Sequence, residues 1–302
     1  MKINSVIRPL LFTLTILTTV TSCGIREDLP PCPPMQIDIV VKDKNYFNAI
    51  ATDGIEPVRD ENLPFREYVS TLYYRLDNAE TGEMVWEQTN FAVTGDDKVY
   101  SVTMPESLPF GKYTLTVWGN MQSDRPLSED ANYTEVTQNH AAENDIYVTT
   151  LNIDYNINNA NFRAELERAK GKLIVMAENM PEDIDFSTKD MDGIYRYIGR
   201  GLNYAGETEF HTETEWSQPV EFSTDMLLCP STGHEATTLD VNFYSTAEGD
   251  GQEPLQPEDI GITMSRNEVT MVRYVYQPKQ DEFEIYVFVN DNWEKVHQME
   301  IE

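Results

Sequence analysis

The sequence predicts an all-β fold: two tandem antiparallel β-sandwiches that follow a signal peptide and a proline-rich tether. Apolar and polar residues alternate in many short segments, turn signals separate these segments, and one stretch alone has helical spacing. Short strands without intervening helices favour sandwiches over a parallel sheet. The roughly 280 residues that remain after the signal peptide suffice for two domains of ordinary size.

The first 22 residues have the features of a lipoprotein signal peptide. Lys2 and Arg8 precede an uncharged run from Leu10 to Val20, which is much shorter than the roughly 20 residues needed to span a bilayer. The following Val20–Cys23 segment resembles the relaxed lipobox of Bacteroidetes. We expect cleavage between Ser22 and Cys23 and acylation of Cys23, by diacylglycerol on its thiol and a fatty acid such as palmitate on its amine. An ordinary signal peptide with a chance cysteine is the alternative.

Residues 23–34 form the predicted lipidated tether. Arg26, Glu27 and Asp28 follow the cysteine closely and resemble a signal for export to the outer face of the outer membrane. A simply solvated tether is the alternative interpretation. The prolines from Pro30 to Pro34 favour an extended polyproline segment, a semi-rigid stalk that lifts the folded part away from the lipid.

The composition excludes some partners. Without residues 1–22, 20 basic residues face 52 acidic ones, a formal charge near −32. Such a chain repels nucleic acid and anionic lipid, and the charge is typical of a soluble extracellular surface. Two cysteines, Cys32 and Cys229, remain in addition to the acylated one. A disulfide between them can form in an oxidising compartment, but the fold is not expected to depend on it.

The first sandwich is predicted over residues 35–158. Alternation within Met35–Val41, Leu72–Leu76 and Tyr113–Val117 indicates strands with one buried face. Turn signals at residues 77–78, 81–82, 95–97 and 109–111 separate the segments. Further strand candidates are residues 84–91, 99–104 and 145–153.

The second sandwich is predicted over residues 159–302. Phe162, Leu166 and Ala169 lie near helical spacing, and Gly171 stands where a helix C-cap would be, so a helix is expected at this boundary. Alternation from Phe283 to Val289, followed by a turn, predicts a terminal hairpin. The remaining strand candidates are residues 172–177, 220–229, 238–244, 269–276 and 293–301.

Residues with catalytic or metal-binding chemistry are scattered. No two of His140, His211, His234 and His297 have metal-ligand spacing, so neither a metal site nor a cofactor is expected. Ser231–Glu235 is interpreted as a polar turn and not as a nucleophile site. Residues 95–97 and 248–251 are oxygen-rich but lack the ligand spacing of a calcium loop, which favours solvated turns. We therefore do not expect an enzyme.

Residues 191–205 are the most aromatic and basic stretch of this acidic chain. Tyr195, Tyr197 and Tyr204 accompany Arg196 and Arg200. A core strand with a loop is favoured over a contact surface for a subunit or a glycan.

Several segments together resemble the FimB/Mfa2 family of fimbrial anchor lipoproteins from Bacteroidales. They are the anchor Cys23 with its tether, residues 72–74, residues 111–120, residues 144–147 and residues 166–173. The resemblance implies two transthyretin-like sandwiches and a lipid-anchored location on the outer membrane, facing the exterior. It also implies a subunit that holds the base of a fimbria, limits its length and binds shaft subunits by strand addition.

Other functions remain open at this point. A fimbrial tip or shaft subunit would share the same sandwiches, although the acyl cysteine beside the first strand favours an anchor. A surface glycan-binding or adhesive lipoprotein would share the lipobox and the tether. Sugar binders usually expose clustered aromatic residues, whereas Trp86, Trp118 and Trp293 lie in or at the start of predicted strands and Trp216 stands just before one.

Overall fold

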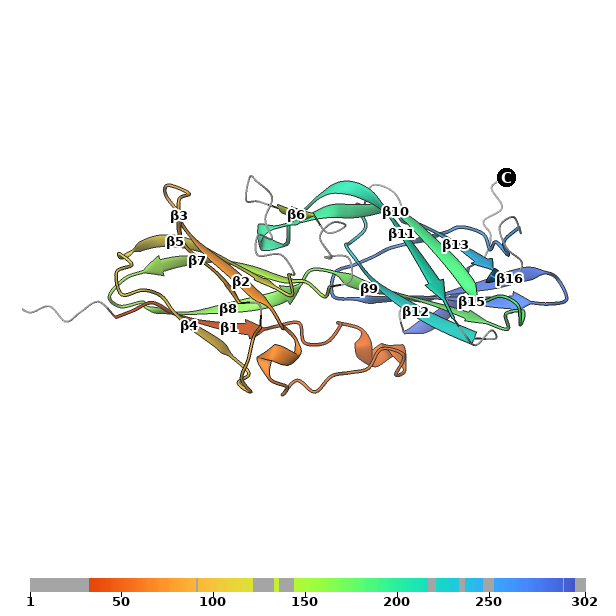
Figure 1. Cartoon of the computed structure of the whole chain (residues 1–302), viewed down its shortest axis with the longest axis horizontal. Helices are drawn as coiled ribbons and strands as arrows, with labels where there is room; N and C mark the ends of the chain where they lie inside the picture. The colour runs from red at the N-terminus through yellow and green to blue at the C-terminus, as the bar shows by residue number, and fades with distance from the viewer. Residues whose placement is uncertain are drawn as a thin grey trace, which may run out of the picture. The chain divides into compact units, whose positions relative to one another are not determined.

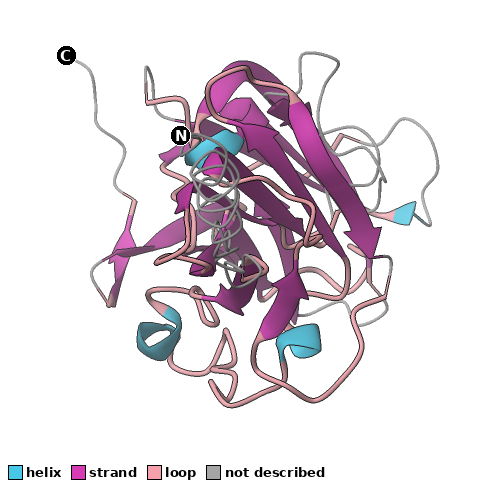
Figure 2. Ribbon diagram, turned by 90° about the vertical axis from the view of Figure 1, so that its left-hand side faces the viewer, coloured by secondary structure: helices cyan, strands magenta, loops and turns pink. Residues whose placement is uncertain are grey.

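The structure is a computed structural model that describes residues 33–90, 92–121, 133–135, 144–216, 221–233, 237–246, 253–289 and 291–296. Residues 34–302 belong to one compact unit. Regular structure in the described ranges is almost entirely strand, as Figure 2 shows, so the predicted all-β class is confirmed. The helices there are single 3-10 turns: η1 (Ala49–Thr52), η2 (Phe65–Glu67) and η3 (Arg200–Leu202).

The first sandwich is built from seven strands in the order β3-β2-β5-β7-β8-β1-β4. β7 and β8 share two register positions only, so the strands on either side of this junction behave as two layers. Inward residues such as Ile37, Leu115 and Val117 fill the space between the layers. The strands are β1 (Gln36–Val41), β2 (Leu72–Asn78), β3 (Met84–Asn90), β4 (Tyr100–Thr103), β5 (Gly111–Gly119), β7 (Tyr147–Tyr155) and β8 (Asn161–Arg168).

The second sandwich has two sheets, β11-β10-β13-β14 and β12-β9-β15-β16-β17 (Figure 1), and the short β6 (Tyr133–Glu135) also pairs with β10. Leu173, Val175, Leu239, Phe243 and Tyr274 lie in the core between the sheets. The strands are β9 (Gly171–Glu178), β10 (Phe186–Gly199), β11 (Tyr204–Glu215), β12 (Glu221–Leu228), β13 (Thr237–Tyr244), β14 (Ile260–Ile262), β15 (Val269–Gln277), β16 (Glu282–Val289) and β17 (Asn292–Lys295).

Most strands predicted from alternation are present. They correspond to β1–β5 and β7 in the first sandwich and to β9, β12, β13, β15, β16 and β17 in the second. β16 and β17 form the predicted hairpin. The long β10 and β11 were predicted only where the core strand with a loop was expected over residues 191–205, because Ser187 and Lys189 take inward positions of β10 and most residues of β11 are polar. Residues 91, 220 and 297–301 of the predicted strands lie outside the described ranges.

The predicted helix over residues 162–169 is wrong. This segment is β8, which pairs in parallel with β1 and antiparallel with β7. Its inward positions are Phe162, Ala164, Leu166 and Arg168, a period of two in which a small residue and a charged one conceal the apolar face. Pairing places β8 in the first sandwich, so the change of sandwich follows Arg168, about ten residues after the expected boundary between residues 158 and 159.

The prediction of one buried face also fails for β2. Tyr73 is buried as fully as its neighbours Leu72 and Tyr74, because a third apolar cluster covers the outer face of this sheet. That cluster joins Tyr73 and Trp118 of the first sandwich to Ile198 and Cys229 of the second. The two sandwiches are therefore packed against each other by apolar side chains.

Arg168, the last residue of β8, is the polar centre of this junction. Its side chain is 3% exposed, and its Nε donates to both carboxylate oxygens of Asp145 at 2.8 and 3.0 Å. The other nitrogens donate to Asn267 Oδ1 and to the Tyr147 hydroxyl, each at 2.6 Å. The guanidinium also lies 4.1 Å from the ring centre of Tyr46. Asn267 belongs to the loop before β15, so one guanidinium joins both sandwiches.

The loop that follows β1 makes a second connection. Asn48 donates its side-chain amide to the Val269 carbonyl and accepts the Val269 N–H, both at 2.8 Å. Glu56 forms an ion pair with Lys172 of β9 at 2.8 Å. Tyr46 and η1 thereby cover part of the outer face of the second sandwich.

Gly171 begins β9 and is not a helix cap. A Cβ added there would lie 2.2 Å from the Ser265 carbonyl oxygen, which belongs to the backbone and cannot rotate away.

We expect Gly171→Ala to lower the free energy of unfolding by roughly 2–3 kcal/mol, as overpacking of a closed site does. Denaturant unfolding of the mature chain measures this. Gly111→Ala is the matched control, because a Cβ added at Gly111 would lie 3.7 Å from its nearest neighbour, a tyrosine ring. Equal destabilisation by the two substitutions would contradict a close backbone contact at Gly171.

Candidate functional site

The predicted lipidation and export residues lie outside the described ranges. Ser22, Cys23, Arg26, Glu27 and Asp28 therefore remain predictions from sequence. Within the ranges that the structure describes, no helix has the length and apolar character needed to cross a bilayer.

The residues that the sequence singled out for metal or nucleophile chemistry do not form a metal-binding cluster in the described part of the chain. No group of three or more potential ligands is close enough to hold a metal ion there. His211 is exposed and contacts Asp190 and Glu213, and these hydrogen bonds raise the pKa of its imidazole. Ser231 contacts the Thr237 hydroxyl and accepts the Met264 N–H, as a structural turn residue does. The other three histidines and residues 248–251 lie outside the described part of the chain.

Cys229 is a free, buried thiol in the cluster between the sandwiches. Burial raises its pKa to about 12, which leaves it almost entirely as the unreactive thiol at neutral pH. Cys32, its candidate partner, lies in the segment that is not described.

The aromatic and basic stretch over residues 191–205 forms the end of β10, the η3 turn and the start of β11. Tyr195 and Tyr204 stack with ring centres 5.6 Å apart, and the Tyr204 hydroxyl donates to the Ala169 carbonyl. Arg200 pairs with Asp77 of β2 at 3.0 Å. These residues take part in the junction between the sandwiches, and the interpretation as core strand plus loop agrees with their positions.

Among the described strands, β11, β14, β12 and β17 form the sheet edges of the second sandwich. A strand at an edge presents a row of backbone N–H and C=O groups that another chain can pair with. In the second sandwich, β11 ends one sheet and β12 ends the other. Thr214 of β11 and Thr224 of β12 bring their hydroxyl oxygens to 3.4 Å, so the two edges lie on the same side of the sandwich.

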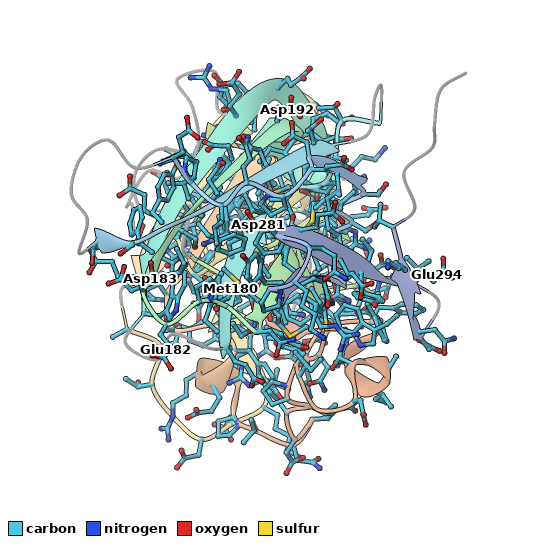
Figure 3. The ribbon with its side chains drawn as sticks, turned by 90° about the vertical axis from the view of Figure 1, so that its right-hand side faces the viewer. Met180, Glu182, Asp183, Asp192, Asp281 and Glu294 are labelled. Atoms are coloured by element: carbon cyan, nitrogen blue, oxygen red, sulfur yellow. The ribbon has the colours of Figure 1, made fainter. Side chains whose placement is uncertain are left out.

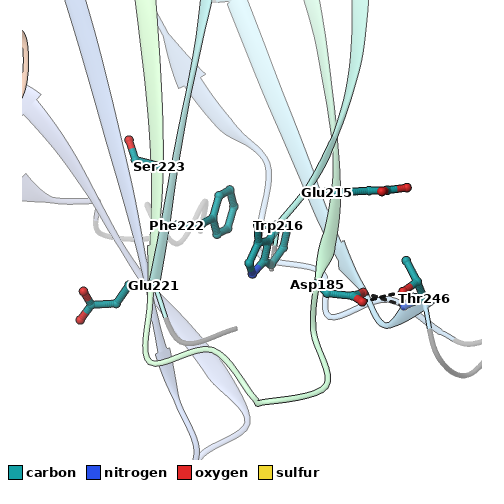
Figure 4. A pocket seen from close by; sticks show the side chains of 7 residues that line it. All are labelled: Asp185, Glu215, Trp216, Glu221, Phe222, Ser223 and Thr246. Carbon is teal, nitrogen blue, oxygen red and sulfur yellow. Dashed lines mark hydrogen bonds between the residues drawn. The ribbon is translucent and has the colours of Figure 1, made fainter. Parts of the chain in front are cut away.

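A cleft of about 730 Å³ lies between the end of β11 and the start of β12 (Figure 4). Trp216 and Phe222 stack there with ring centres 4.0 Å apart and an angle of 13°. Asp185 accepts hydrogen bonds from the hydroxyl and the amide of Thr246, which lower the pKa of its carboxyl and keep it charged. The other lining residues are Glu215, Glu221 and Ser223.

The exposed faces of both edge strands are acidic. On β11, Glu207, Glu209, Glu213 and Glu215 occupy alternate outward positions. Glu221 and Asp225 do the same on β12. Figure 3 shows further carboxylates, among them Asp183 and Asp192, that project from the second sandwich. A partner at the β11 and β12 edges therefore meets the carboxylates of these two strands.

Lys189 lies beneath the β11 edge and is fully buried. Its ammonium donates to the hydroxyls of Ser187 and Thr214, at 2.9 and 3.0 Å. No carboxylate pairs with it among the described residues. Burial lowers its pKa to about 8, since the interior disfavours the charged form.

Neither the burial of Lys189 nor the shared cleft of Trp216 and Phe222 was predicted from the sequence. A lysine between Thr188 and Asp190 looks like an ordinary surface residue. The available signal was the alternation of Ser187, Lys189 and Met191 on one face of β10. A run of polar residues is not recognisable as a buried face until its neighbours are known.

Comparison with known proteins shows which folds this chain shares. No family model matches the sequence. A search of curated proteins also found no match. Solved structures do match, and those below have the same β-sandwich fold at very low sequence identity.

The chain is similar to a candidate adhesin from Bacteroides ovatus, with a TM-score of 0.58, 13% identity, and 91% of this chain and 98% of that one covered. For the fimbrial anchor protein Mfa2 from Porphyromonas gingivalis, the TM-score is 0.53 and the identity 14%, with 88% and 100% covered. For a candidate polysaccharide-binding protein from Bacteroides thetaiotaomicron, these values are 0.54 and 9%, with 87% and 99% covered.

Replacing Lys189 should stabilise the protein. The difference between pKa 8 and the ordinary 10.5 corresponds to about 3 kcal/mol of unfavourable charging in the folded state. The two lost hydrogen bonds offset part of this, so Lys189→Met should raise the free energy of unfolding at pH 7 by about 1–2 kcal/mol.

The sign of the pH dependence follows from the lowered pKa. The unfolded chain binds more protons between pH 8 and 10.5, so the wild-type protein gains stability relative to Lys189→Met across that range. Urea unfolding of both proteins at pH 7 and pH 10 measures the difference. A Lys189→Met protein less stable than wild type at pH 7 would contradict the account of an unpaired buried charge.

Proposed function

We propose that this chain is a fimbrial anchor subunit, attached by an acyl group on Cys23 to the outer membrane and facing the exterior. It would hold the base of a fimbria by accepting a strand of a shaft subunit, and it would limit the length of the fimbria. The shared fold with the anchor Mfa2, together with the predicted lipid cysteine, supports this proposal.

The observation that carries the proposal is the position of β1. Cys23 precedes Gln36, the first residue of β1, by 13 positions. β1 lies between β8 and β4, and β8 continues almost directly into β9 of the second sandwich. A fimbria held by the second sandwich would pull through β8, while the lipid would pull at the start of β1.

This geometry suits a load-bearing connection. β1 and β8 run in parallel over six register positions, so opposite forces on the two strands act along them. The inter-strand hydrogen bonds would then share the load and would not open one after another. The buried contacts of Arg168 continue the path from β8 to the loop before β15.

Strand addition fits the open edges of the second sandwich. Backbone hydrogen bonds to an edge strand give strength, and alternate side chains give specificity. A subunit fixed to the membrane at its N-terminus can end a chain of subunits but cannot lie in its interior. This asymmetry explains how an anchor would also limit fimbrial length.

Glycan binding is the second candidate function, and the Trp216–Phe222 cleft favours it. Aromatic faces beside carboxylates suit sugar rings and their hydroxyls. The similarity to a candidate polysaccharide-binding protein adds support. A glycan-array signal that Trp216→Ala abolishes would favour this function. The stacking of Trp216 on Phe222 argues against it, because one face of each ring is already covered by the other.

Cys23→Ala should release the protein and its fimbriae. Without the acyl chains, no described segment would keep the protein at the membrane, so the membrane-bound fraction of the protein should fall at least tenfold. Cell fractionation and electron microscopy of the producing strain measure both effects. Cys229→Ala is the control, because that thiol lies inside the fold and should leave attachment unchanged.

A deletion strain tests the function itself. We expect its fimbriae to be shed into the medium and to be longer than normal. Cell-attached fimbriae of normal length in that strain would refute the anchor proposal.

A further inference from the structure

Lys189 is an unusual residue to find inside a β-sandwich. It is fully buried on β10, its partners are the hydroxyls of Ser187 and Thr214, and no carboxylate reaches it from the described residues. Buried charges are normally paired, because an ion taken out of water without a counter-ion is costly. A residue that costs stability in the isolated protein is a candidate for a role in binding.

The position of Lys189 connects it to an open edge. β10 is the neighbour of β11, Lys189 stands opposite Thr212, and its ammonium reaches Thr214 on that edge strand. A further strand would lie about 4.8 Å beyond β11. Its inward side chains would enter the same layer as Thr212 and Thr214. A glutamate or an aspartate among them would then be close enough to pair with the Lys189 ammonium.

A second buried donor lies at the same edge. The indole N–H of Trp216 has no acceptor among the described atoms, although its nitrogen is inaccessible to water. Figure 4 shows this ring beside Phe222 in the cleft that continues the β11 edge. Two donors without adequate acceptors therefore lie along one side of the sandwich, which calls for a ligand that supplies oxygen atoms.

The outward face of β11 determines which charges the outward face of a partner strand should carry. From residue 207 to residue 215, four of the five outward positions of β11 are glutamates, Glu207, Glu209, Glu213 and Glu215, and His211 takes the middle one. A partner strand with basic residues at its own outward positions would pair with them across the strands. A second copy of this chain would bring the same glutamates to the same edge, and their repulsion disfavours self-pairing.

We propose that the β11 edge receives an extended segment of another fimbrial subunit, with lysine or arginine on its outward face and a glutamate or aspartate on its inward face that pairs with Lys189. This inference rests on the proposed function and specifies the partner of its strand-acceptor edge. Backbone hydrogen bonds to β11 hold the segment, and the buried ion pair fixes its register.

Lys189→Met tests the inference on cells. The substitution removes the charge and shortens the side chain by one atom. Because it should stabilise the fold, a loss of function would not come from unfolding. We expect at least tenfold more fimbriae in the medium at unchanged surface levels of the protein. Lys189→Gln should behave in the same way. Lys295→Met, on the edge strand β17 where Lys295 pairs with Glu284, is the matched control and should retain fimbriae.

Synthetic strands test the chemistry on the purified mature chain. One 12-residue peptide carries lysines on one face and a single central glutamate on the other, and its twin carries glutamine in place of that glutamate. We expect the glutamate peptide to bind wild-type protein about tenfold more tightly, and the two peptides to bind Lys189→Met equally. Equal binding to the wild type would overturn the inference.

Two further outcomes distinguish a failure of this inference from a failure of the anchor function. If deletion of the whole protein sheds fimbriae but Lys189→Met retains them, this inference fails while the anchor function stands. If polygalacturonate binds in a Lys189-dependent manner and neither peptide does, the site belongs to an acidic glycan and the strand proposal is overturned.

Discussion

The buried guanidinium of Arg168 is the interaction on which the arrangement of the two sandwiches depends. A charge 3% exposed requires partners on every side, and Asp145, Tyr147 and Asn267 supply them from both sandwiches. The guanidinium spreads its donors over three nitrogens and so reaches these separate acceptors at once, whereas the three donors of a lysine ammonium lie on one atom. The junction is therefore specified by geometry as well as by the apolar cluster around Trp118.

Sheet edges are the constraint that couples the fold to its proposed function. A sandwich of short strands must end somewhere, and every end exposes backbone groups that can recruit another chain. The alternating glutamates of β11 disfavour pairing between identical copies. The same charges leave the edge available to a basic partner, so protection from aggregation and partner choice come from one set of side chains.

Lys189 shows how a binding role can conflict with stability. Its ammonium has hydroxyl partners where a carboxylate would serve better, and its burial lowers its pKa. Removing the charge would make the isolated sandwich more stable, yet the charge gives an incoming acidic side chain a buried partner. In this respect the β11 edge differs from the edge strand β17, whose Lys295 already pairs with Glu284.

Local patterns in the sequence were sufficient for the fold class, most strands, the terminal hairpin and the expectation of a lipidated Cys23, since alternation and turn residues act over a few positions. They failed at β8, where Ala164 and Arg168 occupy inward positions, and at β10 and β11, whose inward positions include Lys189 and Thr214. Tertiary structure alone decided these cases. Whether a charged side chain is solvated or buried depends on strands that lie far away in the sequence.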